Sequence, residues 1–187
     1  MKKVFLFLWE FVQIALISLI IIIPIRYYVV QPFFVKGASM EPTFQDSDYL
    51  IVDELSYHLR VPHRGEVIVF RFPENTKQFY IKRIVGLPNE TIKITDGHIT
   101  VINKEYPEGF VLNESDYLVP DNTPGSVEKV LGEMDYFVVG DNRLHSFDSR
   151  RWGELERKYI IGKVLFRIWP FERAMAFEAP DYNFSIN

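Results

Sequence analysis

Cysteine is absent from this chain of 187 residues. Its absence excludes disulfide bonds, cysteine nucleophiles and thiolate-bound metal sites. An excess of positive charge is lacking as well, because the formal net charge is −4. Without a broad basic surface the sequence predicts no nucleic-acid partner.

The sequence also lacks internal repeats and, outside its N-terminal apolar segment, any long amphipathic helical period. Short runs rich in Val, Ile, Phe and Tyr, each bounded by turn residues, predict β-strands instead. These runs cover 47–55, 65–72, 78–87, 90–106, 133–141 and 160–169. We therefore expect a mainly β fold built from antiparallel sheet.

Three polar segments lie among or after these strands. Asp96-Gly97 separates two alternating runs, which predicts a β-hairpin over 91–102. Residues 107–132 are rich in Pro, Glu, Asp, Asn and Gly, and we expect an exposed connection there. The final residues, 179–187, are polar and are expected to be peripheral.

The longest apolar run, residues 4–25, contains only Glu10, Gln13 and Ser18 as polar residues. As a helix it would be about 33 Å long, close to the thickness of a bilayer's hydrocarbon core. A cleaved signal peptide is disfavoured because bulky residues follow the run, where a cleavage site has small ones. A buried soluble helix is rarely apolar on all sides over this length. We expect an uncleaved single-pass membrane anchor.

These observations divide the chain in two. Residues 1–30 are predicted to form a short tail and the transmembrane helix, and residues 31–187 a β-rich domain. The basic residues on the two sides of the run are nearly balanced, since Lys2 and Lys3 precede it while Arg26 and Lys36 follow it. The positive-inside rule therefore favours a cytoplasmic N-terminus only slightly.

Ser39, within VKGASMEPTF (35–44), is the first candidate for chemistry. A serine between glycine and proline is most often a turn residue, and that interpretation stays open on the residues alone. As a nucleophile it would need a base, because an unaided hydroxyl reacts poorly. His145, close in sequence to Asp141 and Asp148, is one candidate base for a triad.

Lys82 is the competing base, because it interrupts the apolar strand FYIKRIVG. Strict alternation places Tyr80, Lys82 and Ile84 on one face and Arg83 on the other, so one of the two adjacent cations is expected to face the apolar side. Burial would lower the pKa of the lysine and supply a neutral amine as a general base. The alternative is that both cations are solvated on an edge strand.

The loop GDNRLHSFDSR (140–150) follows a predicted strand and carries adjacent acids and guanidiniums. It offers Asp141 with Arg143, and Asp148 with Arg150, as pairs that could brace a catalytic platform; a solvated loop is the alternative. Its acids lack EF-hand spacing and alternate with cations. We therefore predict no metal and no cofactor.

Taken together, GASMEPT, RGEVIVFRFPE, FYIKRIVGLPNE and GDNRLHSFDSR resemble the successive motifs of bacterial type I signal peptidases, also called leader peptidases. They occur in that family's order, behind an N-terminal anchor, and the resemblance extends to about Trp169. It implies a mostly β catalytic core with a substrate groove. It also implies a serine endopeptidase that removes signal peptides from secreted preproteins at the outer face of a bacterial cytoplasmic membrane.

The resemblance also implies individual roles. Ser39 would be the nucleophile and Lys82 its general base, acting through an acyl-enzyme. Ser146 would orient the lysine, while Asp148 and Arg150 would brace the loop. Some members carry a serine hydroxyl as an oxyanion donor two residues before the nucleophile, a position occupied here by Gly37.

Substrate preference follows from the same resemblance. The family prefers small side chains at the first and third positions before the cut, as expected of shallow apolar pockets. By position, the pockets would be lined by Phe33, Val35, Met40, Phe44, Leu50, Val69, Tyr80 and Ile81. The apolar run 29–35 would join the anchor to this site.

Two other functions remain as alternatives. The first is a Ser/Lys self-cleaving repressor-type peptidase, which the anchor and the 140–150 loop disfavour. The second is a catalytically inactive anchored β module that binds preproteins or envelope partners. The presence of Ser39, Lys82 and Ser146 argues against the second.

Overall fold

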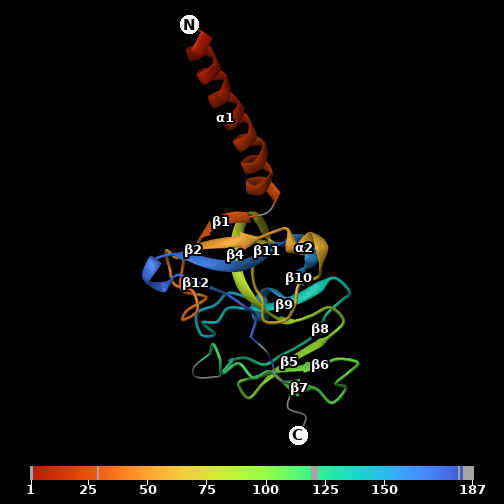
Figure 1. Ribbon diagram of the computed structural model, residues 1–187. Helices are drawn as coiled ribbons and strands as arrows, with labels where there is room; N and C mark the ends of the chain where they lie inside the picture. Colours follow the sequence, from red (N-terminus) through yellow and green to blue (C-terminus); the bar gives the residue numbers. More distant parts are fainter. Residues whose placement is uncertain (1, 29, 119–121, 181, 183–187) are drawn as a thin grey trace.

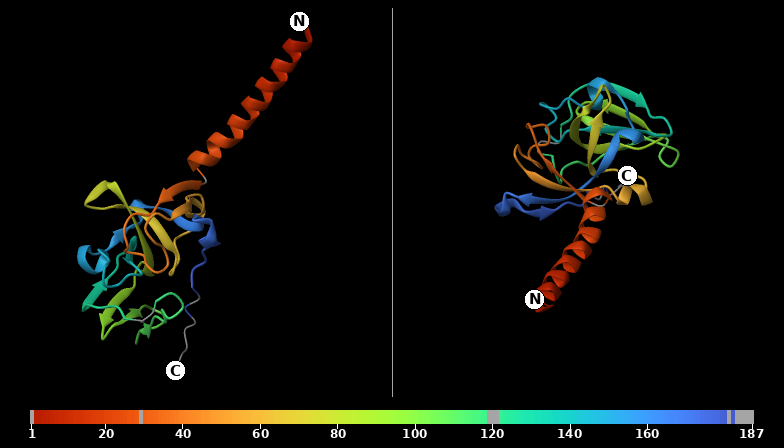
Figure 2. Two further views of the ribbon diagram at one scale, coloured as in Figure 1. Left: turned by 90° about the vertical axis from the view of Figure 1, so that its left-hand side faces the viewer. Right: turned by 90° about the horizontal axis from the view of Figure 1, so that it is seen from above.

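The computed structural model describes residues 2–28, 30–118, 122–180 and 182, with 2–6, 21–28 and 30 described by their backbone alone. Helix α1 (Lys2–Tyr28) projects away from a β-rich body (Figures 1 and 2). Within α1, the described side chains of residues 7–20 are almost all exposed. Among the described residues, no helix contains a stretch long and apolar enough to cross a membrane. The side chains of 4–6 and 21–25, which belong to the predicted anchor, lie outside the described set.

The larger sheet has eight strands, all paired in antiparallel fashion, in the order β1-β2-β11-β3-β4-β9-β10 with β12 beside β11. These strands are β1 (Val30–Phe34), β2 (Tyr49–Asp53), β3 (Val67–Phe72), β4 (Asn75–Gly86), β9 (Asp135–Val139), β10 (Leu155–Glu156), β11 (Ile160–Trp169) and β12 (Met175–Ala176). Short helices α2 (Ser56–Leu59) and α3 (Ser149–Trp152) and 3-10 turns η1 (Arg157–Tyr159) and η2 (Phe171–Arg173) connect or follow them. The expected mainly β, antiparallel fold is confirmed.

The smaller sheet lies at the end of the body remote from α1 (Figure 1). Its strands β5 (Thr91–Thr95), β6 (His98–Ile102), β7 (Phe110–Val111) and β8 (Val127–Val130) run in the order β7-β6-β5-β8. Asp96 and Gly97 connect β5 to β6 with φ angles of 51° and 85°. Positive φ at both residues is the signature of a type I′ turn, so the predicted hairpin is confirmed.

Strand β4 runs through the interior of the larger sheet. Apolar side chains cover both of its faces, in one cluster around Val69 and Leu50 and in another around Phe70 and Ile84. Lys82 and Arg83 are therefore both buried, with exposed fractions of 3% and 4%. The expectation that one of the two cations would face the apolar side is confirmed for Lys82, and Arg83 is buried as well. The edge-strand alternative is wrong, because the sheet is covered on both sides at this point.

The segment 107–132 is more than an exposed connection, which corrects that expectation. It contributes strands β7 and β8 to the smaller sheet and buries Leu112, Glu114 and Thr123. Leu112 packs in the smaller sheet's core, while Glu114 serves as an ion-pair partner for a buried arginine.

The C-terminal segment is also better packed than expected. Tyr182 is buried in the core of the smaller sheet, and its hydroxyl lies 2.9 Å from that of Tyr117. A Cβ on Gly65 would meet Pro180 and Tyr182 at 2.9–3.0 Å, so the segment lies tightly against the body. Residues 181 and 183–187 of the predicted peripheral tail lie outside the described set.

Candidate active site

Ser39 lies in the loop that connects β1 to β2. The base of the loop is closed by two backbone bonds, from Val35 N–H to Asp48 O at 2.9 Å and from Ser47 N–H to Val35 O at 3.0 Å. Its tip is held by Asn142, whose backbone N–H donates to Ser39 O at 3.1 Å and whose side chain donates to Ala38 O at 3.0 Å. The loop that carries Ser39 is thus bonded directly to the loop 140–150.

Lys82 Nζ donates a hydrogen bond to Ser39 Oγ at 2.8 Å and another to Ile81 O at 2.8 Å. Burial lowers the pKa of Lys82 to about 8, although the negative charges of Asp148 and Asp141 oppose the change. A lysine with this pKa carries a substantial neutral fraction near neutral pH, and its free amine can accept the hydroxyl proton of Ser39.

The competing base, His145, is exposed, and it lines a groove that Ser39 and Lys82 also line. Its backbone N–H donates to Asn142 O at 3.0 Å, but within the described residues its imidazole makes no hydrogen bond to Ser39. The geometry therefore brings Ser39 together with Lys82 and leaves the histidine outside the pair.

Arg83, next to the lysine, points toward a different set of partners. It forms a two-pronged ion pair with Asp141, with distances of 2.8 and 2.7 Å, and donates to Gly65 O at 2.8 Å. Asp141 also accepts a 2.6 Å hydrogen bond from Thr43 in the Ser39 loop. Arg83 therefore fixes both the strand that carries Lys82 and the loop that carries Ser39.

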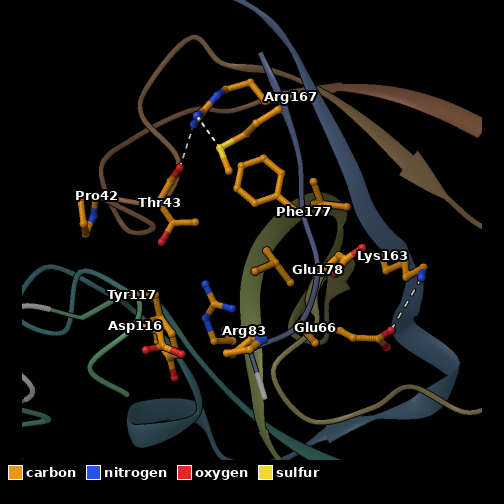
Figure 3. A pocket seen from close by; sticks show the side chains of 15 residues that line it. Pro42, Thr43, Glu66, Arg83, Asp116, Tyr117, Lys163, Arg167, Phe177 and Glu178 are labelled. Carbon is orange, nitrogen blue, oxygen red and sulfur yellow. Dashed lines mark hydrogen bonds and ion pairs between the residues drawn. The ribbon is translucent and has the colours of Figure 1, made fainter. Parts of the chain in front are cut away.

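Figure 3 shows this side of Arg83, where a cavity of about 690 Å³ lies beyond the pair. Tyr117 stacks on the guanidinium, with its ring centroid 3.9 Å from the Arg83 Cζ atom. Across the cavity Arg167 donates to Thr43 O at 2.8 Å. Arg167 is thus a second arginine, besides Arg83, that holds the loop carrying Ser39.

Asp148 and Arg150 form the pair expected from the sequence, at 2.8 Å. Asp148 also accepts the backbone N–H of Gly140 at 3.0 Å, which joins the two ends of the loop. Burial alone would raise the pKa of Asp148, but hydrogen bonds from Arg150 and its positive charge lower it. Asp148 therefore stays ionised and holds the loop closed.

Ser146, predicted to orient the lysine, is buried, and no hydrogen bond joins its hydroxyl to Lys82 among the described residues. Its role stays a prediction. A Cβ on Gly140 would lie 2.3 Å from Ser146 Oγ and 2.3 Å from Ser39 O. This glycine thus allows Ser146 to approach the backbone of the loop that carries Ser39.

The other expected pair, Asp141 with Arg143, does not form, because Asp141 is taken by Arg83. Arg143 instead contacts both carboxylate oxygens of Glu114, at 2.8 and 2.6 Å, and donates to Gly140 O at 3.0 Å. Sequence reasoning missed Glu114 because it lies within a polar segment, with no local signal that marks it as buried.

A groove of about 820 Å³ leads to the Ser39–Lys82 pair and lies between β1 and the first half of β4. Six of the predicted substrate-binding residues line it: Phe33, Val35, Leu50, Val69, Tyr80 and Ile81. Met40 and Phe44 are fully buried in the apolar cluster beside it and do not line it. Sequence reasoning did not assign Phe79 or Phe147, which also line the groove.

Gly37 adopts a φ of 86°, and its N–H donates to Asp46 Oδ1 at 2.7 Å. This is the left-handed region, in which a serine would be strained. The Ser39 N–H makes no hydrogen bond within the described residues.

Comparison with known proteins gives a consistent result. The family described as "Signal peptidase, peptidase S26" matches residues 8–169. "Signal peptidase I" of Leptolyngbya laminosa is 34% identical over 174 residues, which are 89% of this chain and 82% of that protein. "Signal peptidase I V" of Bacillus subtilis is 35% identical over 171 residues, or 88% and 98% of the two chains. A solved signal peptidase I from Enterococcus faecalis shares 28% identity with a TM-score of 0.45, covering 56% of this chain and 97% of that one.

Proposed function

The chain belongs to the signal peptidase I family of enzymes, and we propose that it removes N-terminal signal peptides with Ser39 as nucleophile and Lys82 as general base. The single observation that carries the proposal is the 2.8 Å contact between Lys82 Nζ and Ser39 Oγ in a buried setting that lowers the lysine pKa to about 8. The inactive binding module is disfavoured, because a buried base touching a serine has no evident use in a passive scaffold.

The reaction would proceed in two steps. The neutral amine takes the Ser39 proton as Oγ attacks the scissile carbonyl. The resulting ammonium gives this proton to the leaving amine, which departs and leaves an acyl-enzyme and a neutral Lys82. The negative oxygen that forms in between needs preorganised donors, and the unpaired Ser39 N–H is one. With glycine at position 37, a side-chain hydroxyl from that position is not available. Lys82 then activates the water that releases the acyl group.

The groove supports a preference for small residues at the first and third positions before the cut. Val35, Leu50, Val69 and Ile81, which belong to one apolar cluster, give one part of the groove an apolar wall. A shallow apolar wall discriminates mainly by size. Substrate contact by the buried Met40 and Phe44 stays a prediction, and it would require the Ser39 loop to move.

We further propose that residues 1–30 anchor the enzyme in a bacterial cytoplasmic membrane, with 31–187 as the extracytoplasmic catalytic domain. The support is the apolar sequence of 4–25 and the exposed apolar side chains along α1, such as Phe11 and Ile20. An exposed apolar surface of this kind is typical of a contact with a membrane or with another protein. The anchor would keep the groove near the membrane where preproteins emerge.

The decisive experiment compares variants expressed in membranes with a preprotein substrate. Ser39→Ala and Lys82→Ala should each lower the rate of processing on the order of 10³-fold or more, because each removes one member of a unit. Lys77→Ala, an exposed lysine on the same strand, and Ser126→Ala, an exposed serine, serve as controls. Wild-type rates in both dyad variants would rule out the mechanism.

A further inference from the structure

The first half of β4 leaves one backbone edge open beside Ser39. Strand β3 pairs with β4 as far as Arg83, whereas β9 pairs with it only from Arg83 to Gly86. Ile84 exchanges its backbone bonds with Gly65 and Glu66, on the β3 side. Backbone groups alternate in an antiparallel ladder, so those of Ile81 and Phe79 face the open edge. An extended peptide in the groove can add to this edge as a strand.

A peptide bound as a strand points successive side chains to opposite faces of the sheet. Val69 lies opposite Ile81 in the ladder, so both side chains lie on the same face of the sheet. The apolar cluster on that face is the one expected to receive the first and third substrate residues before the cut. Tyr80, expected from the sequence to line the pockets for the first and third residues, lies instead with Lys82 on the opposite face, where Lys82 Nζ is 5.6 Å from the Tyr80 ring centroid. The second residue before the cut therefore points toward the face of Tyr80.

Phe147 forms the wall on that face. Its ring packs edge-on against Phe72 at 5.9 Å, and Phe72 stacks on Tyr80 at 4.7 Å. Phe147 remains 43% exposed and lines the groove. The next residue, Asp148, is fixed by its bonds to Gly140 and Arg150, so the ring is presented from a rigid loop. An exposed aromatic ring on rigid backbone offers apolar contact at little cost in conformational entropy.

We propose that Phe147, together with Tyr80, forms a specificity subsite for the second residue before the cut, and that the subsite favours a large apolar side chain there. This inference rests on the proposed peptidase function and on binding of the substrate as a strand along β4. Substrate specificity would then depend on three positions, because this subsite contacts the face of the bound peptide opposite to the two shallow pockets.

The test uses the purified full-length protein in detergent and peptide substrates that keep Ala at the first and third positions. The second position carries Leu, Phe, Ala or Asp. Wild type should cleave the Leu and Phe peptides with kcat/KM roughly tenfold above the Ala peptide, the scale expected of an apolar contact. Phe147→Ala should reduce that ratio to about twofold or less, because the contact is lost. A ratio taken within one variant cancels any change in the amount of folded enzyme.

Leu144→Ala is the matched control, since Leu144 is exposed in the same loop and does not line the groove. It should keep the wild-type ratio. Phe147→Leu should give an intermediate ratio and replaces Phe147→Ala if that variant yields too little active protein. A wild-type ratio near one, an unchanged ratio in the Phe147 variants, or an equal change in Leu144→Ala would overturn the subsite. Failure of wild type to cleave even the Ala peptide would overturn the peptidase function as well.

Discussion

The pKa of Lys82 is set by two opposing influences, burial and the charges of nearby acids. A buried lysine loses the hydration of its ammonium, and this loss lowers its pKa to about 8. Asp148 and Asp141 pull the pKa back up, but both acids are already bound to arginines, Arg150 and Arg83. Because the acids are neutralised by these partners, their influence on the lysine is limited, and the amine can lose its proton near neutral pH.

The rate of cleavage should therefore follow the deprotonated fraction of Lys82. With a pKa of about 8 in the folded enzyme, kcat/KM should fall roughly tenfold for each pH unit below about 7 and level off above about 9. Lys82→Arg should be inactive throughout, because a guanidinium stays protonated at these pH values. The measurement is a pH–rate profile of the detergent-solubilised enzyme. A flat profile from mildly acidic to alkaline pH, or an active arginine variant, would contradict a lysine base.

The close packing of Gly140 against Ser39 and Ser146 leads to a second prediction. Since its Cβ would fall 2.3 Å from Ser39 O and from Ser146 Oγ, Gly140→Ala must displace the loop of the nucleophile or that of Ser146. A shift of about 1 Å can cost on the order of 100-fold in rate, and we expect a loss of that size in kcat. Gly132→Ala is the control, because its Cβ would meet only the flexible end of Asp135. Equal activities of the two variants, both folded by circular dichroism, would argue against this packing role.

Single residues also show what the sequence can predict. Ser39 and Lys82 lie 43 residues apart, and only their family motifs, not their local pattern, linked them. A spacing of one intervening residue predicted the pair Asp148–Arg150 correctly, but it also predicted Asp141–Arg143, which does not form because Asp141 pairs with Arg83. The partner of Arg143 was not, since Glu114 is 29 residues away and nothing in its neighbourhood distinguishes it from a solvated acid. When folding brings together two residues that are far apart in the sequence, the residues around each of them do not indicate the contact.

At the scale of elements, the predicted strands were those whose apolar runs fill a core. Strand β1 was missed because its residues continue the apolar segment 29–35 after the helix and include Pro32, which is tolerated on an edge strand. Strands β7 and β8 were missed because they are short, and most of their residues are at least partly exposed. Their pairing depends on β5 and β6, so tertiary contacts decide it rather than local preference.

The ion pair between Glu114 and Arg143 couples the connection 107–132 to the active-site loop. Removing one partner leaves a buried unpaired charge, so Glu114→Gln should lower the free energy of unfolding by about 3–5 kcal/mol. It should also lower activity, since Arg143 holds Gly140 O. Unfolding by denaturant and peptide cleavage would be measured on the same preparation.

The control for this prediction is Glu154→Gln. Glu154 pairs with Lys129, but their side chains are 38% and 37% exposed. A surface pair of this kind contributes less than about 1 kcal/mol. If both variants lost the same stability, the buried pair would have no special role in the loop.

At the scale of the whole molecule, the two ends of the chain connect its main parts: the C-terminal segment joins the two sheets, and the N-terminal helix joins the larger sheet. Tyr182 packs the C-terminal segment into the core of the smaller sheet, after the chain has left β12 of the larger one. At the other terminus α1 leads directly into β1, which forms part of the groove wall through Phe33 and Phe34. The strand that forms this wall therefore follows the helix closely along the chain, and both elements can be followed in Figure 2.

The connection of α1 to the groove would place the groove near a membrane only if α1 lies in a bilayer, and the location of α1 can be tested directly. The chain should stay with the membrane fraction in alkaline carbonate and be released by detergent, and external protease should digest residues 31–187 in spheroplasts. The double variant Ile14→Arg, Ile17→Arg should be extracted by carbonate, because each charge costs about 3 kcal/mol near mid-membrane. The matched variant Ile14→Val, Ile17→Val should stay in the membrane. Release of wild type by carbonate would exclude a spanning anchor, whereas a protease-resistant β domain in spheroplasts would place the groove on the cytoplasmic side, away from exported substrates.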